Sequence, residues 1–158
     1  MKASLILANH VEQQGNVVSL LSAGVDRALV PEGHPGPYLV NLGLALFLEL
    51  EGTEPTRVTL LFELRHRGGA VTTVTVPDPQ GSGSPVSIPL RLGPLVVGAT
   101  GGDEVADGRT RINLGASMAN FAIAELGAYE WVAVVDGVDV ASAAYHVAFT
   151  RQPPQLAT

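Results

Sequence analysis

The sequence predicts an all-β protein, specifically a two-sheet antiparallel β-sandwich of about eight or nine strands. Three observations support this prediction: hydrophobic and polar residues alternate over much of the chain, Gly and Pro cluster between the alternating segments, and one dipeptide has the chemistry of a tight hairpin turn. Successive side chains of a strand point to opposite faces, so alternation gives each segment one apolar face to bury. Two sheets packed together bury all of these faces.

The first strands are predicted over residues 2–8 and 16–22, joined by the polar residues 12–16. The clearest alternation follows over 40–50, where the even positions carry one valine and five leucines. Six aliphatic residues on one face, with a mixed set on the other, fit a strand that lies on a core and fit no helical stripe. Residues 57–65 repeat the pattern after a connection that contains Gly and Pro, which indicates an antiparallel pair.

The middle of the chain is predicted to hold shorter strands between two long loops, Pro77–Pro85 and Gly98–Gly108. The strands predicted here are 71–76, 86–92, 110–114 and, from a segment that could also form a short helix, 119–124. Pro89 has no N–H to donate, so we expect its strand to lie at a sheet edge or to turn that nitrogen outward.

The last hairpin is the best-specified element. Asp136-Gly137 has the preferred composition of a two-residue type I′ turn, in which both central residues take positive φ. This turn pairs Val135 with Val138, and strict pairing from there places Trp131 opposite Ser142. A large aromatic residue then meets a small partner, as cross-strand packing favours.

The second face of this hairpin is the candidate interface. Val132 and Val134 lie on it from the first strand, and Ala141 and Ala143 from the second. If the other sheet does not bury these aliphatic side chains, another protein molecule is the expected cover.

Length and charge limit the organisation and the partners. The 158 residues predict a single domain over residues 1–151, followed by a flexible tail over 152–158. Nine dispersed basic residues in a chain of net charge −6 provide no basic stripe, from which we expect no nucleic acid partner. The short apolar stretch near the N-terminus is below the length of a membrane span or a secretory leader, so we expect no membrane partner and a cytoplasmic location.

No catalytic constellation emerges, and we predict no enzyme, no cofactor and no metal site. The only lysine is Lys2, so a P-loop is excluded. The segment around Ser117 approaches the Gly-x-Ser-x-Gly pattern but ends in Ala119, so a small polar residue at a sheet bend is the favoured interpretation. The four separated histidines form no metal motif: His10, His34, His66 and His146. A loose calcium site is an alternative role for three loop acids, Asp78, Asp103 and Asp107.

Three stretches of the chain carry a resemblance: Lys2–Ala8, Gly15–Gly24 and the Gly-x-Tyr-x-Trp…Asp-Gly pattern of Gly127–Gly137. Together they resemble a family of small bacterial proteins, a domain of unknown function that opens with a β-hairpin and closes with this second one. The resemblance implies a compact β-sandwich without an assigned activity and carries over no catalytic residue.

We therefore expect a non-enzymatic structural or binding module that self-associates, as a homo-oligomer, or docks on a larger assembly. Charged residues make up 15% of the chain where about 25% is usual, so its faces are weakly charged and suited to contact. Two alternatives stay open: a small hydrolase or ligand-binding protein with its site in the 77–85 and 98–108 loops, and an accessory protein of a virion-like particle.

Overall fold

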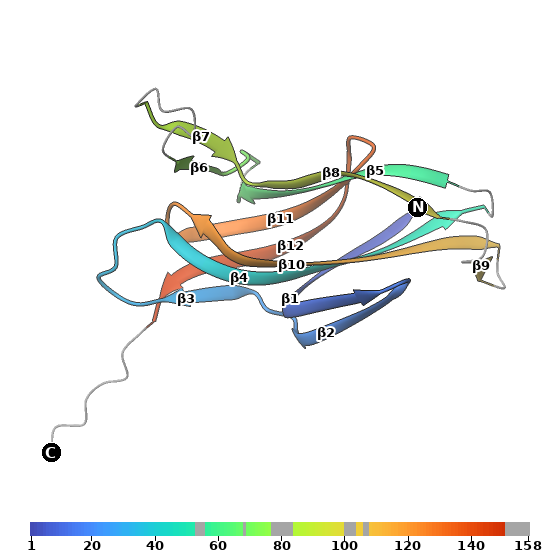
Figure 1. Ribbon diagram of the computed structural model, residues 1–158, viewed down its shortest axis with the longest axis horizontal. Helices are drawn as coiled ribbons and strands as arrows, with labels where there is room; N and C mark the ends of the chain where they lie inside the picture. Colours follow the sequence, from blue (N-terminus) through green and yellow to red (C-terminus); the bar gives the residue numbers. More distant parts are fainter. Residues whose placement is uncertain (53–55, 68, 77–83, 100–103, 106–107, 151–158) are drawn as a thin grey trace, which may run out of the picture.

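The computed structural model describes residues 1–52, 56–67, 69–76, 84–99, 104–105 and 108–150. Twelve strands form in this part of the chain, which contains no helix and therefore no helix able to cross a membrane (Figure 1). Sheet A contains, in spatial order, β2 (Val17–Ala23), β1 (Lys2–Gln14), β4 (Tyr38–Glu51), β10 (Arg109–Ile123) and β9 (Glu104–Val105). Sheet B contains β3 (Arg27–Val30), β12 (Val138–Phe149), β11 (Gly127–Val135), β5 (Thr56–His66) and β8 (Arg91–Ala99). A two-stranded ribbon pairs β6 (Thr73–Val76) with β7 (Val86–Pro89).

The all-β class predicted from the sequence is confirmed, whereas the finer architecture differs. There are twelve strands in three sheets within the described residues, and β3 runs parallel to β12. The four-residue β3 is too short to show a detectable alternation. Its extended conformation is supported by its pairing with β12. The segment predicted as one strand over 86–92 divides at Leu90 between the ribbon and sheet B.

The main core lies between sheets A and B and follows the predicted alternation of β4. The even-numbered leucines from Leu42 to Leu48 are at most 1% exposed. They form one cluster with side chains of sheet B that include Phe62, Trp131 and Tyr145. Burial raises the pKa of the Tyr145 hydroxyl to about 12. Each fully buried Leu or Phe contributes about 1.5–3 kcal/mol, so this cluster dominates the stability of the fold.

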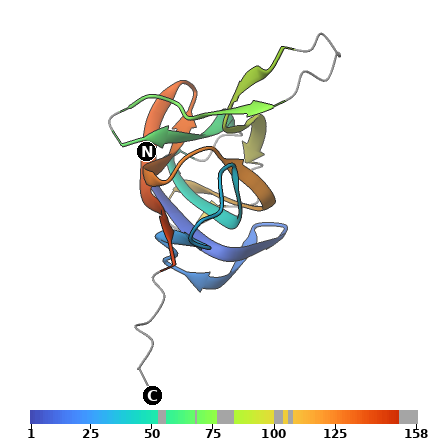
Figure 2. The ribbon, with the colours of Figure 1, turned by 90° about the vertical axis from the view of Figure 1, so that its left-hand side faces the viewer.

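The N-terminal hairpin crosses the outer face of sheet A, the face turned away from sheet B (Figure 2). β1 pairs with β4 through Lys2 to Ala8, and its second half pairs with β2. In this crossing hairpin, residues 9–22, Val11 is buried in a small second cluster with Ala8 and Ala45. A Cβ at Gly43 or at Gly115 would lie 2.5 Å from a Val11 methyl carbon, so glycine at both positions permits the crossing.

The predicted turn of the last hairpin forms, with Asp136 at φ 49° and Gly137 at φ 80°. Val135 pairs with Val138 as predicted, but the pairing shifts between Ala133 and Val134. The extra residue is Val140, and the β-bulge moves every later pair by one position. Trp131 is consequently opposite Ala143, and the predicted pairing with Ser142 was wrong.

Candidate interaction surface

The four predicted interface residues do not form one exposed surface. The bulge in β12 directs Ala141 and Ala143 toward the main core, where both pack. Val132 and Val134 lie on the outer face of sheet B but are only 4% and 8% exposed. The interface predicted on Val132, Val134, Ala141 and Ala143 is therefore divided between the two faces of the sheet.

Ion pairs occupy the outer face of sheet B beside Val132. Arg91 Nε lies 2.8 Å from Glu63 Oε1, Arg65 Nη2 lies 2.7 Å from Glu63 Oε2, and Arg65 Nη1 lies 2.6 Å from Asp139 Oδ2. The Glu63 side chain is only 7% exposed, and its two arginines compensate its burial. The hydrogen bond from Arg65 holds the pKa of Asp139 below its usual value, and that of Arg65 above its own. Glu63 and Asp139 on this face are thus paired with Arg65 and Arg91.

The crossing hairpin covers the outer edge of β10 with side-chain amides. Gln13 Nε2 donates to the Asn113 carbonyl at 3.0 Å, and the Gly115 N–H donates to Gln13 Oε1 at 2.8 Å. Asn16 Oδ1 accepts the Asn113 N–H at 3.2 Å. These amides take the positions that a neighbouring strand would fill, so this part of the β10 edge is already paired.

Ser117, considered above as a nucleophile, binds the crossing hairpin to β10. Its hydroxyl accepts the Val11 N–H at 2.8 Å and donates to the Val11 carbonyl at 2.8 Å. His10 Nδ1 lies 3.2 Å from the same oxygen, and His10 Nε2 lies 3.5 Å from Glu12 Oε1. The Val11 carbonyl is the nearer acceptor for the single hydroxyl proton, which favours a structural link over activation of the hydroxyl by His10. The arrangement is a structural clamp.

By contrast, no strand in the described part of the chain pairs with the outer edge of β8. β8 ends the order of sheet B, pairs only with β5 among the strands of that sheet, and exposes Leu95 by 40% and Val96 by 72%. The backbone N–H and carbonyl of Thr59 on β5 bond to Asp136, on the side away from β8. Because backbone groups alternate in direction along a strand, those of Val58 and Leu60 point at β8 and meet Val97 and Leu95. Val96, which lies opposite Thr59, therefore points its N–H and carbonyl outward.

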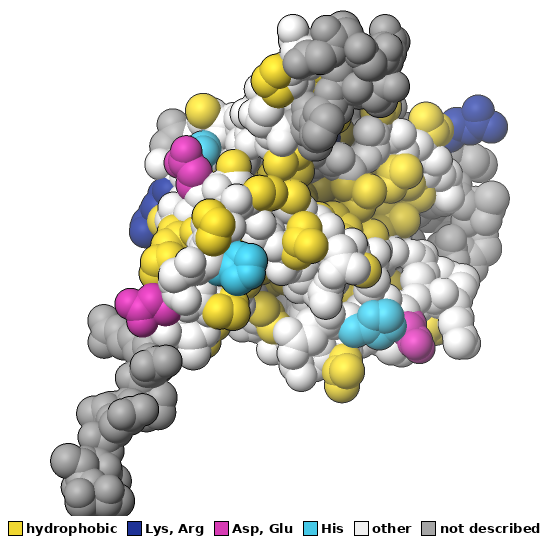
Figure 3. Space-filling view, turned by 60° about the vertical axis from the view of Figure 1, so that its left-hand side comes forward, with side chains coloured by type: hydrophobic (Ala, Val, Ile, Leu, Met, Phe, Trp, Pro, Cys, Tyr) yellow, Lys and Arg dark blue, Asp and Glu magenta, His cyan; other side chains and the backbone are white. Residues whose placement is uncertain are grey.

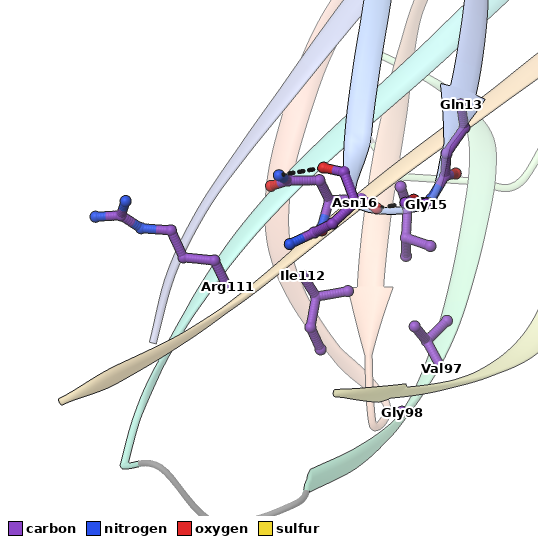
Figure 4. Close-up of a pocket in the computed structure, with 9 residues that line it drawn as sticks. Gln13, Gly15, Asn16, Val97, Gly98, Arg111 and Ile112 are labelled. Carbon is purple, nitrogen blue, oxygen red and sulfur yellow. Dashed lines mark hydrogen bonds between the residues drawn. The ribbon is translucent and has the colours of Figure 1, made fainter. Parts of the chain in front are cut away.

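A pocket of about 330 Å³ lies between the β8 and β10 edges (Figure 4). Its lining residues are Gln13, Gly15, Asn16, Val97, Gly98, Arg111, Ile112, Asn113 and Leu114. The Gln13 and Asn16 amides are engaged with β10, and Arg111 points away from the pocket toward Glu49, with Nη2 3.6 Å from Oε2. Hydrophobic side chains gather in a hollow on this side of the molecule (Figure 3). Within the described residues, β8 therefore presents the exposed aliphatic side chains of Leu95 and Val96, and backbone groups with which no strand pairs.

The remaining candidate sites are the loop acids of the calcium alternative and the four histidines. The calcium alternative cannot be assessed, because Asp78, Asp103 and Asp107 lie outside the described residues, as do most of the 77–85 and 98–108 loops and the predicted tail. In the part of the chain that is described, no three His, Asp or Glu side chains gather as a metal site. Of the histidines, His66 packs on the ring of Tyr129 with centroids 5.0 Å apart.

Comparisons with known proteins place this chain in no family. No protein-family model matches the chain, and no curated protein matches it. Among solved structures, it is similar to Pseudomonas fluorescens alkylpurine DNA glycosylase AlkC bound to DNA containing an abasic site analog, with 12% identity and a TM-score of 0.43. The match covers 78% of this chain and 28% of that one.

This neighbour corrects the expectation that nucleic acid is excluded as a partner, because the similar structure is of a protein bound to DNA. The exclusion rested on dispersed charge, which limits phosphate neutralisation and does not address individual contacts to bases or sugars. At a TM-score of 0.43, the similarity assigns neither the fold nor the activity of that protein to this chain.

Proposed function

We propose that this protein is a non-enzymatic structural or binding module that works by association, with copies of itself or with a larger assembly. The observation that carries the proposal is the exposure of aliphatic side chains on strands of a weakly charged chain. Six of them are more than half exposed: Val17 (67%), Leu21 (64%), Leu29 (58%), Leu39 (63%), Val96 (72%) and Val138 (61%). Contact with another protein removes this surface from water.

The same proposal interprets the two facing five-stranded sheets as a β-sandwich that the crossing hairpin curls on one side. The proposal also includes a relationship to small bacterial β-sandwich proteins. The sequences of the first and last hairpins support this relationship. The contacts of Ser117 favour this reading over a hydrolase, since they use the hydroxyl as a structural link.

Size-exclusion chromatography with light scattering, together with native mass spectrometry, tests the proposal over roughly 1–100 µM protein. We expect masses that are multiples of the 16.4 kDa chain, or a stable complex with another protein isolated from cells. A single-chain mass throughout this range, with no co-purifying partner, would contradict the proposed function.

A further inference from the structure

The β8 edge has a backbone pattern that fits its own reversed copy. The N–H and carbonyl of Val96 point outward, and by the same alternation so does the N–H of Gly98. The register shifts beyond Leu95, but the Pro94 carbonyl shares a trans peptide plane with the Leu95 N–H, which points at β5, so this carbonyl also points outward. A twofold axis through Val96 places Gly98 of each strand opposite Pro94 of the other. Pro94 has no N–H, but this pairing needs only its carbonyl.

We propose that β8 pairs antiparallel with β8 of a second copy of this chain, centred on Val96, so that the two B sheets become one continuous sheet. This inference rests on the proposed function and names its partner. Each Val96 exchanges two hydrogen bonds with its counterpart, and each Gly98 N–H donates to a Pro94 carbonyl of the other copy.

The side chains are self-complementary in the same register. Val96, the most exposed of the large hydrophobic side chains described, meets Val96 of the second copy on the outer face. Leu95 lies opposite Val97 on the other face, so both contacts are between aliphatic side chains.

The charge distribution permits a second copy at this edge. Two chains of net charge −6 repel, so their contact must avoid acidic residues. The segment from Leu92 to Ala99 contains no charged residue, and Arg91 at its end is paired with Glu63. Of the features that commonly block strand addition, β8 lacks a Lys and an inward-pointing charge. Its Pro94 and the register shift beside it lie at the margin of the proposed pairing, where only the Pro94 carbonyl is used.

Three variants and two controls test the pairing. Val96→Lys puts two like charges opposite each other, and Val96→Pro removes the central donor without removing a bond to β5. We expect each to weaken dimerisation at least about tenfold by light scattering. The control is Val138→Lys, which changes a side chain of similar exposure at a hairpin turn and leaves the dimer intact. Circular dichroism checks that each variant retains its strands.

Cysteine cross-linking tests the register, because the natural chain has no cysteine. Val96→Cys places two thiols directly across the axis, within the range that a disulfide spans, and we expect oxidation to yield a covalent dimer. Leu95→Cys is the control, since the two thiols are then displaced from each other and form a disulfide at least about tenfold more slowly.

A dimer that persists in both Val96→Lys and Val96→Pro, or equal cross-linking of the two cysteine variants, overturns pairing through β8 while the proposed function stands. A wild-type chain that is monomeric alone but forms a stable complex with another protein also overturns the self-pairing and keeps the function. Only a monomer without any partner removes both.

Discussion

The β8 and β10 edges border one pocket but differ in how their backbone groups are satisfied. Amides of Gln13 and Asn16 pair with Asn113 and Gly115 of β10, whereas no described strand pairs with the outward backbone groups of Val96 on β8. An edge strand can add a further strand unless something blocks it. The difference teaches that the crossing hairpin closes one edge internally, while the other edge has no partner strand within the described part of the chain.

The largest expected effect comes from breaking the crossing that closes β10. Gly43→Ala puts a methyl group 2.5 Å from Val11 Cγ2 and 3.0 Å from the Val11 backbone nitrogen. The backbone nitrogen can move away only if the whole hairpin moves with it. We expect a loss of about 3 kcal/mol in the free energy of unfolding, measured in urea. Gly98→Ala on β8 is the control, because the nearest atom is 3.9 Å away; a change larger than about 1 kcal/mol there would contradict the comparison.

Removing the Ser117 clamp between the crossing hairpin and β10 should have the next largest effect on stability. Ser117→Ala leaves the N–H and carbonyl of the buried Val11 without the hydroxyl they share, at a cost of about 2 kcal/mol. Ser142→Ala, an exposed serine on β12, should change stability by less than about 0.5 kcal/mol in the same urea titration. Equal stability of the two variants would show that Ser117 is not a clamp.

Opening the β10 edge directly should have a smaller effect. Gln13→Ala removes the acceptor of the Gly115 N–H and the donor to the Asn113 carbonyl, for a loss of about 1 kcal/mol. Hydrogen exchange at the Gly115 amide should become faster, since the edge is then exposed to water. The neighbouring Gln14→Ala serves as the control, and unchanged exchange at Gly115 in Gln13→Ala argues against closure by this amide.

The smallest effect concerns the outer face of sheet B. Asp139 has a lowered pKa because Arg65 donates hydrogen bonds to it, so its ionised form stabilises the folded protein above its ordinary value of 3.8 and this contribution fades as pH falls below that value. Asp139→Asn should cost about 0.5 kcal/mol at pH 7 and progressively less below pH 4. Urea titrations at several pH values measure this, and a difference that grows at low pH contradicts it.

The sequence predicts much of the fold because most signals are local. The alternation of β4 correctly identified the leucines of the core, and Asp136-Gly137 correctly identified its turn. The bulge at Val140 has no local signal, and it alone separates Ala141 and Ala143 from the outer valines. The four side chains predicted to share one face are divided because one added residue reverses the side of every later side chain.

The two edges escaped prediction for different reasons. Gly93-Pro94 interrupts the alternation within β8, so the strand beyond it was assigned in part to a loop. The closure of β10 depends on contacts between residues about a hundred positions apart, which a single sequence does not reveal. One usable signal was present: Gly43 lies inside the predicted strand 40–50 and Gly115 directly follows the predicted strand 110–114, and glycine within a strand often marks close approach of another backbone.

The crossing hairpin also has a consequence for the order of events during synthesis. Val11 and Ser117 are separated by 106 positions, so residues 9–22 leave the ribosome well before the strand on which they dock. Contacts this distant along a chain form slowly. We expect residues 9–22 to stay undocked until β10 has emerged, so they reach their native position later than their place in the sequence suggests.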